Sequence, residues 1–296
     1  MIGIGGGGDV VGALAVARLC ESLGTPFVLG GVAWERLPID PHPGPRSASE
    51  IEGGRALGGG AILASPETST PEGVRFSESR MAAHLSAETV LIDVSGGAAG
   101  AAEGIAAALR ELDCDLLVGL DVGGDVLARG DEAELASPLC DAVMVAAALR
   151  AGDESRPLLA VIGPGCDGEL RPAEVLARVA DLARAGAWLG AWGVTPEAAD
   201  ELEAAAAAVP TEASLQVARC ARGEIGEAEI RRGRRRVELG PVGALAFFFD
   251  ADAALAELPL ARAVSESASI EEARAALAAR GIRTELDYER ERSLSA

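Results

Sequence analysis

The chain contains no lysine, and all 26 of its basic residues are arginine. Lysine forms Schiff bases with carbonyl substrates and with pyridoxal phosphate, and it contacts phosphate in the P-loop, so these chemistries are excluded. Any phosphate or carboxylate group must therefore be held by arginine side chains or by backbone N–H groups.

Aromatic residues are also scarce, at 3% of the chain, and the formal net charge is -20. Few aromatic rings argue against stacking platforms for single-stranded nucleic acid. The negative charge opposes binding to nucleic acid and to anionic membranes. We therefore expect neither of these partners.

Paired cysteines, paired histidines and long apolar runs are missing as well. The five cysteines stand singly, which is typical of reduced thiols, and none forms a nucleophile motif with a histidine. His42 and His84 have no metal-type partner three or four residues away, which argues against a zinc site. With no signal peptide or membrane span recognisable, we expect a cytoplasmic protein.

The chain does contain glycine-rich segments that are followed by an acidic residue, and the first of them lies near its beginning. An apolar start leads into Gly5, Gly6, Gly7 and Gly8, then Asp9 and an Ala/Val-rich helix. Such a strand–glycine–helix unit directs free N–H groups at a ligand, and we expect an anion there. The alternative is a tight turn without a ligand. A dinucleotide is disfavoured because only two residues precede Gly3, too few for the strand of that fingerprint.

Similar units recur along the chain, each an apolar strand whose tip carries acids and small residues. The ligand-binding and acidic candidates at these tips are Asp93 and Ser95, then Asp121, Gly123, Gly124 and Asp125, then Gly165 and Asp167. The alternation of strand and helix predicts an α/β fold, a Rossmann-like doubly wound, mostly parallel sheet with helices on both faces. Parallel strand tips share one edge, so these candidates are expected to meet there.

We predict a single domain over residues 1–296 with a Gly/Pro-rich insertion at about 34–88. A strand is expected over Thr25–Ala33, and a polar tail from Glu289 to the end. The insertion's proline-rich loop carries Arg36 and Arg46, which we expect to reach the anion. The arginine run at 231–236 is expected to pair with surface carboxylates or with another subunit of a homo-oligomer.

Several of these motifs together resemble one known family. They are Gly5–Gly12, Trp34-Glu-Arg, Asp40–Arg46, Asp121–Asp125 with Ser137–Asp141, and Thr211–Ser214. The chain is similar over nearly its whole length to the domain of unknown function numbered eleven-fifty-two. The resemblance implies the α/β fold, and it implies that the sheet edge carrying these motifs matters for function. It implies no particular reaction. A fainter similarity links Asp121–Asp125 to a Gly-Gly-Asn-Glu segment of the D-glutamate cyclase family, with Asp125 and Val126 in place of Asn and Glu.

The strand-tip acids suggest either a divalent metal site or carboxylate acid/base chemistry. We expect Mg²⁺ or Mn²⁺ at Asp121 and Asp125, because Mg²⁺ is usually held by one or two carboxylates plus substrate oxygens. The catalytic candidates are Asp121, Asp125, Asp93 and Glu212. Some acids are alternatively plain helix caps, a role that suits Asp9 and Asp141.

The leading hypothesis is an enzyme of hydrolase or lyase/cyclase type that acts on a small anionic metabolite. The alternatives are a non-catalytic nucleotide or metabolite sensor and a structural subunit of an oligomer. Crowded acids favour catalysis over simple anion binding, because carboxylates repel an anion unless they hold a metal or a proton.

Overall fold

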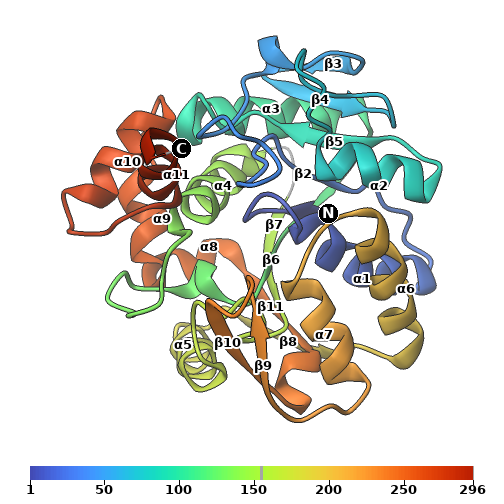
Figure 1. Ribbon diagram of the computed structural model, residues 1–296, viewed down its shortest axis with the longest axis vertical. Coiled ribbons are helices and arrows are strands. Elements are labelled where there is room, and N and C mark those ends of the chain that lie inside the picture. The colour runs from blue at the N-terminus through green and yellow to red at the C-terminus, as the bar shows by residue number, and fades with distance from the viewer. Residues whose placement is uncertain (154–155, 296) are drawn as a thin grey trace.

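A nine-stranded sheet forms the centre of the computed structural model, which describes residues 1–153 and 156–295 (Figure 1). Its strands lie in the order β3-β4-β5-β2-β1-β6-β7-β11-β8. Their bounds are β1 Ile2–Gly3, β2 Gly30–Val32, β3 Arg55–Gly58, β4 Ala61–Ala64, β5 Thr89–Ile92, β6 Leu116–Val122, β7 Arg156–Ile162, β8 Trp188–Gly193 and β11 Leu245–Asp250. A separate hairpin pairs β9 (Gly226–Ile230) with β10 (Arg235–Leu239).

The five central strands, β5, β2, β1, β6 and β7, are parallel to one another. Short apolar runs such as that of β6 suit this position, because a strand buried on both faces needs no alternation of polar residues. Antiparallel strands complete both edges: β4 pairs with β5 and β3, and β11 pairs with β7 and β8. The predicted α/β class and mostly parallel sheet are confirmed.

A small apolar cluster surrounds Phe76, and two large ones lie between the sheet and the helices that cover its two faces. One large cluster involves α1 (Asp9–Ser22), α2 (Ser77–Leu85), α6 (Pro196–Ala208) and α7 (Ala213–Ala221). The other involves α3 (Gly97–Glu111), α4 (Pro138–Arg150), α5 (Pro172–Arg184), α8 (Ala251–Ala254), α9 (Pro259–Val264), α10 (Ile270–Ala278) and α11 (Glu285–Ser295). The Ala/Val/Leu-rich helices therefore bury their apolar sides against a shared sheet, as a doubly wound fold requires.

The structure corrects two predicted segments, a strand and the tail, and shows which elements the 34–88 segment forms. The strand expected over Thr25–Ala33 is only Gly30–Val32, in part because Pro26 has no N–H to donate to a neighbour. The segment at 34–88 extends the sheet with β3 and β4 and covers it with α2, so it belongs to the main core. The polar tail expected from Glu289 is wrong, because α11 packs beside α4 and buries Leu286 (Figure 1).

The strand order changes direction between β1 and β6. From β1 the chain continues through β2 and β5 toward one edge, and from β6 it continues through β7 toward the other. The loop after β1 leads to α1 and the segment after β6 leads to α4, helices that belong to different core clusters. In open α/β sheets the ligand crevice lies outside the carboxyl ends of the strands at such a reversal.

Candidate functional site

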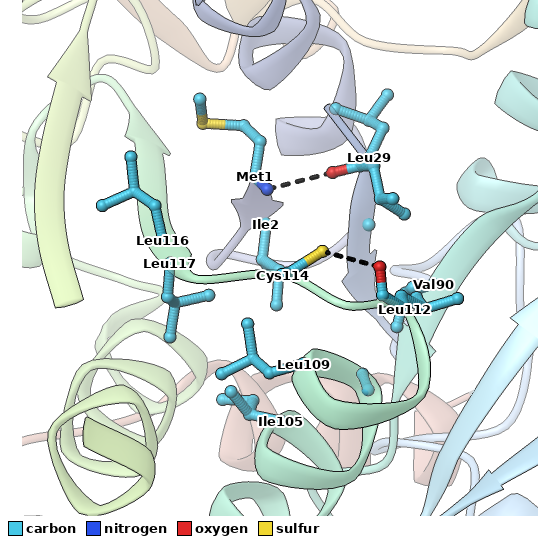
Figure 2. A pocket seen from close by; sticks show the side chains of 13 residues that line it. Met1, Ile2, Leu29, Val90, Ile105, Leu109, Leu112, Cys114, Leu116 and Leu117 are labelled. Carbon is cyan, nitrogen blue, oxygen red and sulfur yellow. Dashed lines mark hydrogen bonds between the residues drawn. The ribbon is translucent and has the colours of Figure 1, made fainter. Parts of the chain in front are cut away.

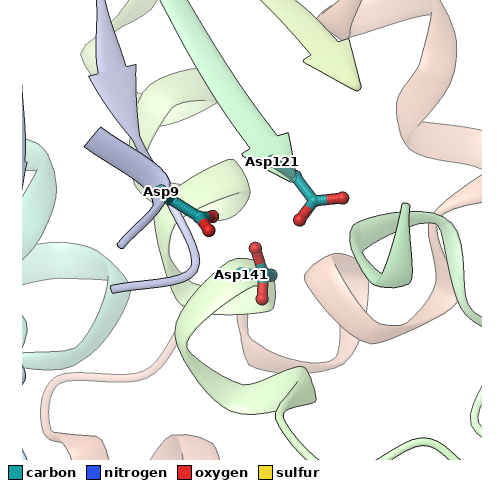
Figure 3. Close-up of side chains that lie close together, drawn as sticks. All are labelled: Asp9, Asp121 and Asp141. Atoms are coloured by element: carbon teal, nitrogen blue, oxygen red, sulfur yellow. The ribbon is translucent and has the colours of Figure 1, made fainter. Parts of the chain in front are cut away.

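Three carboxylates converge at this reversal. Asp9 begins α1, Asp121 lies near the end of β6, and Asp141 lies in the first turn of α4. Each offers an oxygen atom, and the three atoms lie within 4.8 Å of one another (Figure 3). We refer to Asp9, Asp121 and Asp141 as the first acid set. Asp121 and Asp141 are buried, whereas Asp9 is half-buried and lies at the rim.

A second group of carboxylates lies at the ends of β6 and β7. Asp125 follows β6, Asp167 and Glu169 follow β7, and one oxygen from each lies within 4.8 Å of the others. We refer to Asp125, Asp167 and Glu169 as the second acid set. All three side chains are buried. The predicted pair Asp121 and Asp125 is therefore divided between two sets.

Glycine is required at the turns that hold these acids. The Gly5 N–H donates to Asp9 Oδ2 over 2.9 Å, and a Cβ at Gly5 would lie 2.6 Å from that oxygen. Gly123 has a φ of +123°, and a Cβ there would lie 2.2 Å from Asp167 Cγ. The Gly124 N–H donates to Asp121 Oδ2 over 2.8 Å. Bare backbone thus lets the carboxylates approach the turns closely.

Burial opposes ionisation of most of the cluster. It raises the pKa values of Asp121, Asp125 and Asp141 well above the ordinary range, and it raises those of Asp9 and Asp167 to about 7. Neighbouring carboxylates add repulsion in the same direction, as expected for acids that share a site.

Glu169 is the exception among the six acids. Burial again opposes its ionisation, but Arg235, Arg231 and the hydrogen bonds from Ser137 and Ala136 together outweigh that effect and lower its pKa. Arg235 Nη1 lies 3.1 Å from Glu169 Oε1, and the N–H groups of Ala136 and Ser137 donate to Oε2. Glu169 is therefore a fixed anion. Two members of the predicted arginine run pair with this one carboxylate.

Arg36 lies beside the first acid set. Its Nη2 donates to the Gly5 carbonyl over 2.7 Å and lies 3.3 Å from Glu285 Oε1. The guanidinium also stacks on Trp34, 4.3 Å from the ring centroid. The structure thus brings Arg36 to the glycine loop, residues Gly5 to Gly8, where we expected it to contact an anion.

Arg46 has a different position. It forms a buried two-bond ion pair with Asp40, with distances of 2.7 and 2.9 Å. Its remaining ion-pair partners are Glu50 and Glu72. None of these contacts joins it to the glycine loop.

Two of the backbone N–H groups of the glycine loop already donate hydrogen bonds within the protein. The Gly5 N–H binds Asp9 and the Gly7 N–H donates to the Trp34 carbonyl over 3.2 Å. Gly5 to Gly8 remain half-exposed, so the loop is not packed shut. A Cβ at Gly8 would lie 2.4 Å from Thr211 Cβ, which brings the Thr211–Ser214 motif against the loop.

The remaining predicted residues lie outside the two acid sets. Asp93 accepts the N–H groups of Ala48 and Ser95 and so fastens two loops. Glu212 is exposed and accepts the Arg231 N–H. The Gly165 N–H donates to the Gly123 carbonyl over 2.7 Å, which ties together the turns after β7 and β6.

Sequence reasoning missed the parts played by Asp141, Glu169 and Glu285. Asp141 does not act as a plain cap: its Oδ1 accepts no hydrogen bond, and Glu285 accepts the N–H groups of Leu139 and Cys140 instead. Glu285 and Glu289 are four residues apart, which places them on one face of α11. That spacing was the available signal for them.

A small apolar pocket lies at the opposite edge of the sheet, where β1 and β6 begin (Figure 2). Ile2, Leu109 and Leu117 are among its walls, and the lining includes no carboxylate or arginine side chain. The Met1 ammonium group donates to the Val28 carbonyl over 3.0 Å nearby. This pocket has none of the groups that the proposed chemistry requires.

Comparisons with known proteins agree with the resemblance. Residues 1–293 match the family model described as "Protein of unknown function (DUF1152)". No curated protein and no solved structure matches the chain. Among the helices that the structure describes, none is long and apolar enough to cross a membrane. Since the match covers almost every residue, the chain belongs to the DUF1152 family of proteins of unknown function.

Proposed function

We propose that the protein is an enzyme that acts on a small anionic metabolite bearing phosphate or carboxylate. The chemistry is of hydrolase or lyase/cyclase type. The observation that supports this best is the clustering of six carboxylates, from the starts of α1 and α4 and the carboxyl ends of β6 and β7, beside the strand-order reversal. Such a cluster is costly to bury, and strongly perturbed acids in a crevice are typical of catalytic sites.

Divalent-metal assistance is one route for this chemistry. Carboxylate oxygens are the ligands that Mg²⁺ and Mn²⁺ prefer, and a bound cation would polarise a substrate oxygen. The side chains that fit this role include Asp121 and Asp125, which lie at the junction of the two acid sets. Asp141 Oδ1 and both Asp167 oxygens are buried without hydrogen-bond partners, which supports a role for them as ligands of a cation.

Carboxylate acid/base catalysis is the other route. A general acid or base works best with a pKa near the operating pH. Asp9 has a pKa raised to about 7 and lies at the half-exposed rim, where a substrate can reach it. In this route Asp9 transfers the proton, and its pKa is raised mainly by burial, with a smaller contribution from repulsion by Glu169.

The anionic group of the substrate is expected next to the glycine loop. Arg36 provides the nearby positive charge, and the half-exposed backbone of Gly6 and Gly8 leaves room for close approach. The five free cysteines agree with a reducing compartment such as the cytoplasm.

The test is a metabolite screen by thermal shift, with and without Mg²⁺, followed by turnover assays on the compounds that stabilise the protein. Asp121→Asn and Asp125→Asn should abolish turnover. Asp115→Asn is the matched control, because Asp115 is exposed at the other end of the same strand region. A ligand that binds equally well to both site variants and is never turned over would favour the sensor alternative.

A further inference from the structure

We propose that the site binds two divalent cations, one in each acid set. This inference rests on the proposed function for the location of the site and extends it by assigning a second metal position. The first cation would take oxygens from Asp9, Asp121 and Asp141, and the second from Asp125, Asp167 and Glu169. In each set the oxygens lie within 4.8 Å of one another, close enough for shared coordination after small side-chain shifts.

The first set has an unused oxygen and a cleared space. Asp141 is 2% exposed, and its Oδ1 has no hydrogen-bond partner. A Cβ at Gly5 would lie 3.3 Å from that oxygen and 2.6 Å from Asp9 Oδ2. Glycine at this position therefore leaves the region between two carboxylates free of side-chain atoms.

The second set has the same two features. Asp167 is 5% exposed, and neither of its oxygens has a hydrogen-bond partner. A Cβ at Gly123 would lie 2.3 Å from Asp167 Oδ1, so glycine again keeps a carboxylate accessible. Glu169 differs, because backbone N–H groups and Arg235 hold it in place.

Charge balance indicates two cations instead of one. Arg36 is paired with Glu285 and Glu289, and within the described residues no arginine forms an ion pair with a member of the first set. Arg231 and Arg235 form their ion pairs with Glu169 and act on Asp167 only from a greater distance, so within the described part of the chain Asp125 and Asp167 have no ion-pair partner. Each set thus retains at least two uncompensated carboxylates, enough to balance one divalent cation.

The turn between Asp121 and Asp125 connects the two positions. Gly124, inside this turn, donates to Asp121 Oδ2, so one short segment supplies a ligand to each cation. Two adjacent cations can bind the attacking and the leaving oxygen of a displacement at phosphorus or at an ester. The ligand class that fits this arrangement is an oxyanion ester, which narrows the proposed substrates.

The experiment counts Mn²⁺ ions by isothermal titration into the full-length protein after removal of metals. Wild type should bind two ions per chain. Asp141→Asn and Asp167→Asn, one variant in each set, should each bind one. Asp115→Asn should bind two, which controls for surface acids. Circular dichroism checks that each variant is folded, and Asp125→Asn replaces Asp167→Asn if that variant does not fold.

A wild-type count of one or none, or two ions retained in both site variants, would overturn the inference. Because the titration contains no substrate, this result leaves the proposed enzyme open to its own test. Conversely, failure of the metabolite screen does not change the ion count.

Discussion

One guanidinium nitrogen of Arg36 contacts both the beginning and the end of the chain. Arg36 Nη2 donates to the Gly5 carbonyl and lies 3.3 Å from the carboxylate of Glu285. Glu285 in turn accepts the N–H groups of Leu139 and Cys140 at the start of α4. The position of the glycine loop therefore depends on a residue of α11, 280 positions away in the sequence.

Glu285→Ala should destabilise the protein by about 3 kcal/mol. The substitution removes the nearer carboxylate partner of the half-buried Arg36 and the acceptor of two N–H groups at the start of α4, and both losses are costly. Urea unfolding of wild type and variant measures the difference.

Glu291→Ala is the control for that measurement, because Glu291 lies on the same helix and its side chain is 66% exposed. It should change the unfolding free energy by less than about 1 kcal/mol. Equal losses of unfolding free energy in the two variants would show that any change in α11 destabilises the protein and that the contacts of Glu285 are not the cause.

Arg46→Ala should lower stability by about 3–5 kcal/mol, because it leaves the buried carboxylate of Asp40 without its charged partner. Replacing both charges, as Asp40→Asn with Arg46→Met, should recover most of the loss. Thermal and urea unfolding provide the measurement. An Arg46→Ala variant with normal stability and weaker ligand binding would instead support the anion-binding role expected from the sequence.

Gly8→Ala should destabilise the protein by about 1–3 kcal/mol through overpacking. Gly8 has an ordinary φ of -79°, but its new methyl group would lie 2.4 Å from Thr211 Cβ. Gly100→Ala in α3 is the opposite case, because open space surrounds that position. It should stabilise by about 0.5–1 kcal/mol. Differential scanning calorimetry of both variants separates the two effects, and similar losses would contradict the argument.

Two buried glutamates outside the acid sets predict a pH effect on stability. Burial, followed by repulsion from Glu35, raises the pKa of Glu78 well above its ordinary value of 4.5. The folded state therefore keeps a proton that the unfolded chain has already lost, and stability falls as the pH rises from 4.5 toward the folded pKa.

Glu78→Gln should weaken this dependence, because the amide has no proton to lose. Unfolding free energies measured from pH 4.5 to pH 8 should fall less steeply for the variant than for wild type. Glu88→Gln, at the exposed position just before β5, should keep the wild-type slope. Identical slopes for all three proteins would mean that Glu78 is not protonated in the folded state.

The sequence predicted the position of a site residue where that position depends on the residues next to it in the chain. Asp9 and Asp167 follow strands and Asp121 lies near the end of one, each beside a glycine-rich turn, so local pattern and the geometry of parallel sheets were enough to bring them to one edge. The division of Asp121 and Asp125 between two sets was not predictable, because it depends on which side of the turn each side chain faces.

The roles that could not be predicted are those that depend on partners far away in the sequence. Asp141 has the sequence context of a helix cap, yet Glu285 fills that role from α11. Arg36 and Arg46 belong to one loop with similar surroundings in sequence. Only the fold shows that Arg46 is held by Asp40 while Arg36 reaches Gly5.

The burial of Trp34 gives the site an internal fluorophore. The indole Nε1 donates to Glu289 over 3.1 Å, and the ring carries the Arg36 guanidinium on its face. The chain has three tryptophans, and the other two, Trp188 and Trp192, lie together on β8. In a Trp188→Phe, Trp192→Phe background, emission comes from Trp34 alone. A movement of Arg36 toward a bound anion would then alter the emission intensity or wavelength without any added label.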